Sequence, residues 1–372
     1  MRLLHVIDTL DHHPGHVSMS LRGLLAGLDK AGVICDIVAG ASHDEAVEHW
    51  RFGGETVVVD EDDAGAMLEA VAPMARHADV VHIHAPQVEL AKFAAAGAAA
   101  SHTPLLVSPY GEMIKGLRGR GKLSIWLENR RFAKKFAAAK SVVCLNDEEQ
   151  GFMRARGLRG TFRTISFGFD GDVVERAAGD GEAIKFPWDD GKRVIAYFGD
   201  IDGRLGLVQF FKACDELEDE LEDWRIVVAG RPINNWLELF QAGARRHGKE
   251  HLGDFVVYPD AAQQRAVLDA AELVVLPAPT PVPPVAALWA MWHGKAVLAS
   301  TATGLSEVES AGAGAVVEPT RKGILGGLDR LVTRSAEELR AQGEAAQRLV
   351  RERWHWSKLL DEHLELYRTM IG

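Results

Sequence analysis

The stretch from Ala271 to Glu309 limits the folds open to this chain more than any other part of the sequence. An apolar run at 273–276 is followed by a proline-rich loop, a helical pattern at 285–293 and a second apolar run at 296–300. The order strand, loop, helix, strand builds a parallel sheet with a ligand crevice at the carboxyl ends of its strands. We therefore expect an α/β fold.

Apolar runs and helical patterns alternate in the same way along the whole sequence, which is typical of parallel sheets. Residues 179–192 interrupt the alternation with glycine, proline and charged side chains, so we interpret them as a linker. A chain of 372 residues also exceeds the usual size of one hydrophobic core. We expect an N-terminal domain at 1–178, a C-terminal domain at 193–350, and a last helix at 351–372 that packs back on the N-terminal domain.

The spacing of apolar residues predicts the individual elements. Strands are expected at 2–8, 33–39, 55–59, 79–84, 104–108, 141–145, 161–166, 193–198, 224–229, 255–258, 273–276, 296–300 and 315–318. Helices are expected at 18–30, 64–76, 122–139, 147–156, 207–218, 236–247, 262–270, 285–293, 335–350 and 354–370.

Composition and charge exclude several classes of protein. The hydrophobic content of 47% and the charged content of 26% are ordinary for a globular protein. A formal net charge of −11 and a pI near 5.8 argue against a nucleic acid as partner. The three cysteines lie far apart in apolar segments, which indicates a reducing compartment and no metal site. Without a signal-peptide pattern or an apolar run of about 20 residues, we expect a cytoplasmic protein.

Several short motifs follow one another along the chain: HHPGHV at 12–17, DVVHIH at 79–84, PLLVSPYGEM at 104–113, ISFGFD at 165–170 and YFGDIDGRLG at 197–206. Together with the 271–309 stretch, they resemble the motifs of the GT-B glycosyltransferases of family 4, the group 1 retaining transferases. The resemblance covers nearly the whole chain. It implies two Rossmann-like domains that face each other across a cleft, a nucleotide sugar as donor, a glycan or lipid as acceptor, and no cofactor.

The residues that the resemblance places at the donor differ from the family pattern. Two family glutamates that flank the helix at 285–293 are replaced by Pro281 and Trp289, and neither can accept a hydrogen bond from ribose or sugar hydroxyls. The arginine and lysine that neutralise the diphosphate are replaced by Asp200 and Leu205. For Trp289, we favour a role in the core over stacking on a base or sugar. The donor site is therefore degenerate relative to the family.

Other positions in the matching motifs are candidates for nucleotide-sugar binding. Arg204 lies one residue before the family lysine, and it either swings toward a diphosphate or remains an exposed loop arginine. Arg231 either binds phosphate or fills the site. The glycines are candidates because they let backbone approach a phosphate closely. The complete candidate set is Gly15, Gly199, Arg204, Gly230, Arg231, Gly304 and Glu307.

The catalytic residues cannot be assigned from the sequence, although three candidates follow from the resemblance. His16 replaces the second glycine of the opening loop and is expected to face a phosphate or the acceptor. Tyr110 stands where the family has a histidine before a glycine. Glu112 follows at the expected acceptor entrance, and the alternative for it is a solvated loop acid.

His82 and His84 alternate along a predicted strand and therefore point to the same face of a sheet. Two imidazoles in this arrangement are suitable ligands for a metal ion. Since no third ligand follows at a useful spacing, we expect a structural role for this pair rather than a metal site.

A basic run between residues 115 and 135 stands out in this acidic chain. Apolar residues are interleaved with it, so a helix here has two interpretations. One is a helix that docks on anionic lipid headgroups, which would make the protein peripheral at the inner membrane face. The other, which we favour, buries the apolar stripe in the core and leaves the charges in water. The basic residues are Lys115, Arg118, Arg120, Lys122, Arg130, Arg131, Lys134 and Lys135.

Two classes of function remain open. The first is an enzyme, a divergent hexosyltransferase that moves a sugar from a nucleotide donor to a glycan or lipid acceptor. The second is a catalytically inactive relative that acts as the protein partner of an active homologue or as a glycan-binding module. The overall resemblance favours the first, and the replaced donor-site residues favour the second.

Overall fold

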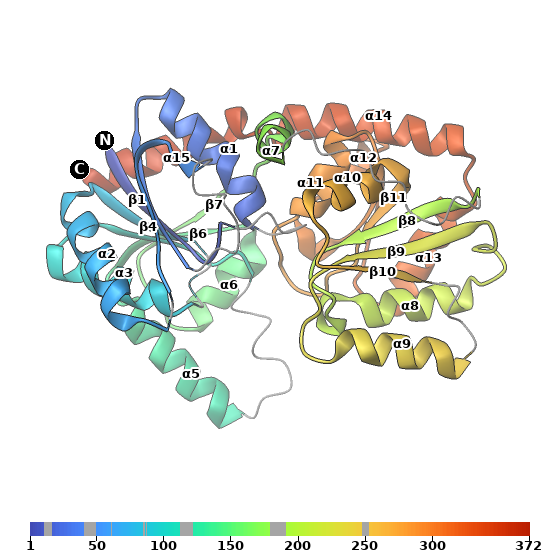
Figure 1. Cartoon of the computed structure of the whole chain (residues 1–372), viewed down its shortest axis with the longest axis horizontal. Coiled ribbons are helices and arrows are strands. Elements are labelled where there is room, and N and C mark those ends of the chain that lie inside the picture. The colour runs from blue at the N-terminus through green and yellow to red at the C-terminus, as the bar shows by residue number, and fades with distance from the viewer. Residues whose placement is uncertain are drawn as a thin grey trace. The chain divides into compact units, whose positions relative to one another are not determined.

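The computed structural model describes residues 1–10, 17–40, 50–60, 62–84, 86, 88–111, 122–178, 191–247 and 253–372 (Figure 1). The chain forms two compact units, each with its own parallel sheet. Unit 1 contains the N-terminal strand, Ser20–Val173 and Trp356–Gly372, and unit 2 contains mainly Val174–His355. The expected α/β fold with two Rossmann-like units is confirmed.

The sheet of unit 1 has seven parallel strands in the order β3-β2-β1-β4-β5-β6-β7. The chain starts in the middle of the sheet, builds one edge, and then returns through β4 to build the other. A switch of this kind places the carboxyl ends of β1 and β4 side by side at the usual ligand position. The strands are β1 Arg2–Ile7, β2 Ile34–Ala39, β3 Gly53–Val58, β4 Val80–His84, β5 Leu105–Ser108, β6 Ala139–Cys144 and β7 Thr161–Thr164.

Helices cover both faces of this sheet (Figure 1). One face packs a purely apolar core against α2, α3, α5 and α6. The other face lies under α1 and α15, and the hydroxyl of Tyr367 on α15 makes a hydrogen bond with His82 on β4. The helices of unit 1 are α1 Val17–Lys30, α2 Ala64–His77, α3 Glu89–Ser101, α5 Lys122–Lys135, α6 Asp147–Ala155 and α15 Trp356–Ile371, and α7 Gly171–Ala178 follows at its boundary.

The first residue of α15 fixes that helix to unit 1. Trp356 is buried, and its indole Nε1 donates a hydrogen bond of 2.7 Å to the carbonyl oxygen of Ser20. The ring lies against two glycines: a Cβ on Gly23 would come within 2.3 Å of it, and a Cβ on Gly168 within 2.5 Å. The indole therefore occupies a socket that only glycines leave open.

The sheet of unit 2 has six parallel strands in the order β10-β9-β8-β11-β12-β13. It repeats the switch of unit 1, here between β8 and β11. The carboxyl ends of β8 and β11 are therefore the expected ligand position in this unit. The strands are β8 Arg193–Phe198, β9 Trp224–Gly230, β10 Asp254–Val257, β11 Ala271–Leu276, β12 Ala296–Ser300 and β13 Gly314–Val317.

The helices of unit 2 also form two layers around their sheet. The apolar core on one face is shared by α8 and α13. On the other face, α11 packs against α14, and every residue of α11 is buried. The helices are α8 Leu207–Glu216, α9 Trp236–His247, α10 Ala261–Ala270, α11 Val285–Trp292, α12 Glu307–Ser310, α13 Arg321–Val332 and α14 Ala336–Arg353.

Local sequence signals account for several helix starts. Asp260 and Gln263 form a reciprocal capping box at α10, and Ser335 and Glu338 form one at α14. Such boxes satisfy two backbone N–H groups that the first turn of a helix otherwise leaves free. Among the helices formed by the described residues, none combines the length and apolar character needed to cross a bilayer.

Most predicted elements coincide with the structure, and four helices of the described residues were not predicted. Strand β8 and helix α9 have the predicted bounds, and α5 ends at Lys135 rather than at residue 139. The helices without a prediction are α3, α7, α13 and the four-residue α12. Two of them, α3 and α13, are rich in small residues, which weakens the apolar spacing that predicts a helix.

Candidate functional site

The loop that follows β8 carries two of the predicted donor-site residues of unit 2, Gly199 and Arg204. It begins at Gly199 and ends at Gly206, which caps the N-terminus of α8 with a φ of 96°. A Cβ on Gly206 would come within 2.0 Å of the carbonyl oxygen of Pro277, and one on Gly230 within 1.8 Å of that of Gly199. These glycines therefore allow the loops after β8, β9 and β11 to touch at the carboxyl edge of the sheet.

Two arginine–aspartate pairs lie in this region. Arg204 donates through Nε and Nη2 to both oxygens of Asp202, at distances of 2.6 to 3.0 Å. Arg231, the first residue after β9, donates through Nε and Nη2 to Asp200 at 3.2 and 3.4 Å. The arginine side chains are 42% and 39% exposed. The aspartates hold both guanidinium groups in place without burying them.

The loops that carry these pairs are joined by backbone hydrogen bonds. The Ile201 N–H donates to the carbonyl of Arg231, and the Ile233 N–H donates back to the carbonyl of Ile201. The two arginines are therefore held on neighbouring loops at the ends of adjacent strands. Asp200 replaces a family arginine, and its negative charge would repel a diphosphate. In the structure it forms an ion pair with Arg231.

Three of the four replaced family positions, Leu205, Pro281 and Trp289, are apolar and buried. Leu205, at the lysine position, forms a small cluster with Ala278 and Val282, next to the buried Pro281. Trp289, at one glutamate position, is 4% exposed and packs edge to face on Phe198, with ring centroids 5.1 Å apart. The interpretation of Trp289 as a core residue is confirmed.

Gly304 and Glu307 lie on the turn that follows β12. Gly304 has a φ of 76°, which ends the short 3-10 turn at Thr301–Thr303. The Glu307 carboxylate accepts a hydrogen bond of 2.9 Å from Arg353 on α14. Partial burial raises the pKa of Glu307, but the bonds from Arg353 and its own backbone outweigh this and lower that pKa below its usual value. Glu307 therefore ties this turn to α14.

In unit 1, Tyr110 and Gly111 form the turn after β5. Both have left-handed backbone conformations, with φ of 52° and 70°. The buried Glu149 on α6 accepts hydrogen bonds from the N–H groups of Gly111 and Leu145, which fixes this turn. Gly15, His16 and Glu112 lie outside the described residues, so their predicted roles stay predictions.

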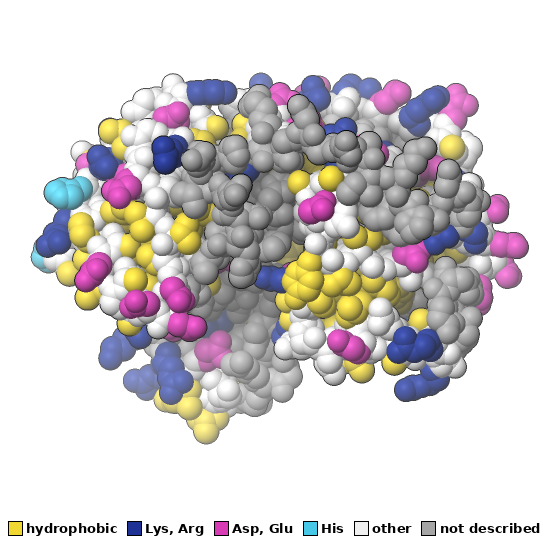
Figure 2. Space-filling model, viewed as in Figure 1, with side chains coloured by type: hydrophobic (Ala, Val, Ile, Leu, Met, Phe, Trp, Pro, Cys, Tyr) yellow, Lys and Arg dark blue, Asp and Glu magenta, His cyan; other side chains and the backbone are white. Residues whose placement is uncertain are grey.

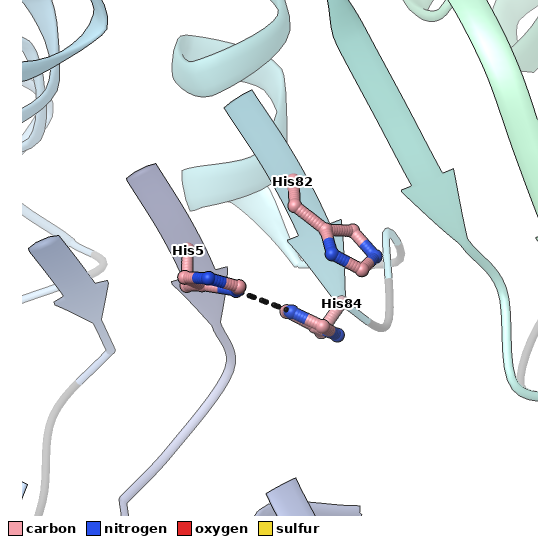
Figure 3. A group of neighbouring side chains, drawn as sticks. All are labelled: His5, His82 and His84. Atoms are coloured by element: carbon pink, nitrogen blue, oxygen red, sulfur yellow. Dashed lines mark hydrogen bonds between the residues drawn. The ribbon is translucent and has the colours of Figure 1, made fainter. Parts of the chain in front are cut away.

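From this turn, the hydroxyl of Tyr110 makes a hydrogen bond with His84. His84 belongs to a cluster of three histidines with His5 and His82 (Figure 3). The cluster is buried in unit 1, and His5 Nδ1 lies 3.0 Å from His84 Nε2. Burial and the neighbouring His363 lower the pKa of His5 to about 3, and burial lowers those of His82 and His84 as well. All three imidazoles are therefore neutral at pH 7.

His5 is the member that sequence reasoning missed. It is 79 residues from His84 in the sequence and comes from β1, which pairs with β4 so that His5 is the direct neighbour of His82. The spacing of His82 and His84 gives no hint of it. Only the pairing of the first strand with the fourth brings the third ring to the pair.

Comparisons with known proteins bear on the fold of both units. Residues 182–349 match the family model described as "Glycosyl transferases group 1". Among curated proteins, none matches the sequence significantly. Among solved structures, the Anabaena protein Alr3699/HepE in complex with UDP-glucose is similar over 99% of this chain and 100% of its own, with a TM-score of 0.76 and 14% identity.

Two further structures agree with that match. The sucrose-phosphate synthase of Thermosynechococcus elongatus covers 100% of this chain and 99% of its own, with a TM-score of 0.71 and 15% identity. WaaG, a glycosyltransferase involved in lipopolysaccharide biosynthesis, covers 98% and 99%, with a TM-score of 0.69 and 15% identity. The fold is GT-B. At these identities the structural likeness shows the GT-B fold alone, so the site residues of this chain carry the functional argument.

Proposed function

We propose that this GT-B protein transfers a sugar from a nucleotide-sugar donor to a glycan or lipid acceptor, with Arg204 and Arg231 as the groups that bind the diphosphate. One observation carries the proposal: two half-exposed guanidinium groups lie on hydrogen-bonded loops at the carboxyl ends of β8 and β9. In an open parallel sheet, this edge is where ligands bind. Transfer breaks the bond between the sugar and the diphosphate, and cations there stabilise the charge that develops on the leaving group.

The geometry of the two pairs suits this role. In both arginines the Nε and Nη2 groups donate to an aspartate, and Nη1 makes no hydrogen bond to a described residue. A guanidinium has five N–H donors, so each arginine keeps donors for a phosphate while the aspartate holds its orientation. Gly206 has no side chain to cap α8, so the first N–H groups of that helix are a further attraction for an anion.

Calorimetric titration with UDP, ADP and GDP tests the donor site. Arg204→Gln and Arg231→Gln each remove a charged hydrogen-bond donor, so we expect each to weaken binding about 10- to 100-fold. Arg265→Gln is the matched control, because Arg265 makes a similar exposed pair with Asp269 on α10. Equal effects of all three substitutions, or no binding at millimolar nucleotide, would contradict the assignment. Release of nucleoside diphosphate from a bound nucleotide sugar tests transfer itself.

The alternative function is a catalytically inactive relative that binds a glycan or an active partner protein. The cluster of Leu205, Ala278 and Val282 favours it, because apolar packing here replaces a family lysine. Trp289 favours it as well, since a buried indole occupies a family glutamate position. Nucleotide binding without any sugar transfer, or glycan binding without nucleotide binding, would support this alternative over the enzyme.

We also propose that α5 docks the protein on an anionic lipid surface, which would give it access to a lipid acceptor. The expectation that α5 buries its apolar stripe is only half right. Phe132 and Phe136 are buried in the core of unit 1. Leu123, Trp126 and Leu127, however, are 70%, 51% and 43% exposed.

The exposed residues of α5 form one face of the helix. Apart from Ser124 at its border, this face consists of residues spaced at i, i+3, i+4, i+7, i+8 and i+11, namely Leu123, Trp126, Leu127, Arg130, Arg131 and Lys134. The apolar members gather at the start of the helix and the basic members nearer its end, and Figure 2 shows Lys and Arg side chains over α5 next to exposed hydrophobic ones. In a chain of net charge −11, this face combines the apolar insertion and local positive charge that an anionic bilayer requires.

Vesicle flotation tests this surface. We expect binding to vesicles that contain phosphatidylglycerol and loss of binding in Trp126→Glu. The double change Arg130→Gln and Arg131→Gln removes two charges worth about 1 kcal/mol each near the surface, so binding should fall roughly tenfold or more and lose salt dependence. Leu68→Glu is the control, because Leu68 on α2 is 53% exposed. Equal binding to neutral vesicles, or equal loss in the control, would contradict the proposal.

A further inference from the structure

The histidine cluster lies at an unusual place for three polar side chains. His5 on β1 and both histidines of β4 point to one face of the sheet, close to the carboxyl ends of these strands (Figure 3). On the opposite face, the same strands carry Leu4, Val6, Val81 and Ile83, all in the apolar core. A sheet that needed only packing would carry apolar residues on both faces. The three imidazoles therefore call for an explanation beyond stability.

Three hydroxyl groups surround the imidazoles. The two nitrogens of His82 lie 2.8 Å from the hydroxyls of Tyr367 and Ser108, and His84 Nδ1 lies 2.8 Å from the hydroxyl of Tyr110. These partners come from three elements, namely α15, the end of β5 and the turn after it. Hydrogen bonds from outer partners of this kind fix the tautomer and the ring orientation of metal-bound histidines.

One nitrogen of the cluster is not satisfied in this way. His5 Nε2 is buried and has no hydrogen-bond partner among the described residues. A neutral imidazole carries one N–H and one lone pair, so the bond between His5 and His84 satisfies only one nitrogen of His5 in either tautomer. Buried polar atoms without partners are rare and costly, and a bound ion or water in their neighbourhood is a usual reason for them.

We propose that His5, His82 and His84 bind a transition-metal ion, with Zn²⁺ as the expected occupant. One nitrogen from each ring lies within 4.8 Å of the others. Three neutral imidazoles are a common ligand set for zinc. This inference is independent of the proposed donor site, because it uses residues of unit 1 alone.

Small ring rotations are enough to form the site. Zinc–nitrogen bonds of 2.0–2.1 Å place tetrahedral ligand nitrogens about 3.4 Å apart. His5 and His84 begin with nitrogens 3.0 Å apart, so the ion takes the place of the hydrogen bond between them, and the proton of that bond moves to the other nitrogen of its own ring. His82 gives up one of its two hydroxyl bonds and keeps the other, as an outer contact. Each ring is neutral before and after binding, so the step requires no change in the number of bound protons.

Metal content and cobalt spectroscopy test the proposal on the full chain without a histidine tag. We expect about one zinc ion per chain after growth with zinc, measured by plasma mass spectrometry. After removal of zinc, added Co²⁺ should give the visible absorption bands of a tetrahedral site. His5→Gln and His84→Gln should abolish both signals. Tyr110→Phe removes an outer contact and should lower metal affinity about 10- to 100-fold.

Two control variants separate a specific site from adventitious binding or misfolding. His363→Gln replaces a buried histidine that neighbours the cluster without belonging to it, and His102→Gln replaces an exposed one. Both should keep the stoichiometry and the cobalt bands. The proposal is overturned if the chain holds no zinc and gives no cobalt bands, which would leave a water molecule as the partner of His5. It is also overturned if the controls lose metal as completely as His5→Gln.

Discussion

The socket of Trp356 allows a sharp test of the packing of unit 1. Replacing Gly23 by alanine adds one methyl group in the middle of α1. In an open helix this change stabilises a protein by about 1 kcal/mol, because glycine costs more conformational entropy than alanine. Here the new Cβ would lie 2.3 Å from the Cδ1 of Trp356 and 2.9 Å from the Cβ of Asp170.

Neither neighbour can move away easily. The indole already lies against Gly168 on another side, and its Nε1 is held by the carbonyl of Ser20. Overpacking of this kind costs about 1–3 kcal/mol, and a displaced indole loses a hydrogen bond worth about 1 kcal/mol. After the gain in helix propensity, we expect Gly23→Ala to destabilise unit 1 by about 1–3 kcal/mol.

The matched control is Gly151→Ala in α6 of the same unit. A Cβ on Gly151 meets no atom within 4 Å, so the same methyl group should stabilise unit 1 by about 0.5–1 kcal/mol. Native-state hydrogen exchange read by mass spectrometry gives the opening free energy of each unit separately, which a single denaturation curve of a two-unit chain does not. Hydrogen exchange in peptides from β1 and β4 should report the effect on unit 1. Exchange in peptides from β8 and β11, which belong to unit 2, should not change. If Gly23→Ala raised protection as much as Gly151→Ala, the indole would not lie on Gly23.

Three further predictions concern single side chains. Trp289→Ala leaves a cavity beside Phe198 and should lower the opening free energy of unit 2 by about 3–5 kcal/mol. A change below about 1 kcal/mol, measured by hydrogen exchange, would mean that the site collapses or that the indole is not packed. The Glu149 carboxylate accepts hydrogen bonds from two backbone N–H groups, and the amide of Glu149→Gln can accept only one of them, since its NH₂ group is a donor. The free energy of local opening at the Gly111 turn should therefore fall by about 1–3 kcal/mol. Unchanged hydrogen exchange at that turn would refute the contact. Glu307 has a pKa lowered by its bond to Arg353, so its stabilising contribution is present above its unfolded pKa and is lost as the pH falls through the folded value. Melting temperatures measured from pH 7 to pH 3 should therefore fall less steeply in Glu307→Gln, and parallel curves would count against this ion pair.

The sequence predicted the strands well because apolar runs between turn residues have few alternatives. The sequence did not predict helices in which glycines allow close packing against the sheet. In α13, a Cβ on Gly323 would come within 2.4 Å of the Glu318 carbonyl oxygen, and one on Gly327 within 2.5 Å of Val317. These glycines let the helix approach the sheet closely, yet in a sequence they indicate a break. The Ala-rich α3 has no clear polar face and was missed for a related reason.

The candidate site, like the fold, was predicted only in part. The burial of Trp289 followed from the apolar character of its helix, so the sequence was enough. The partners of Arg204 and Arg231 were not predictable, because each pair depends on the path of a short loop. The exposed face of α5 was misjudged for a further reason. Its apolar residues match a core-facing stripe in spacing, and only the tertiary structure shows that Phe132 and Phe136 suffice for the core.

The return of the chain to unit 1 at Trp356 has a consequence for its biosynthesis. A ribosome releases the residues of unit 2 before those of α15, so unit 2 can fold while unit 1 still lacks a helix. During that interval the socket at Gly23 and the hydroxyl contact of His82 with Tyr367 are unfilled. The nascent N-terminal unit must therefore stay soluble with one face of its sheet partly bare. A chain that ends at His355 and has left the ribosome should accordingly have unit 1 sensitive to protease and unit 2 resistant.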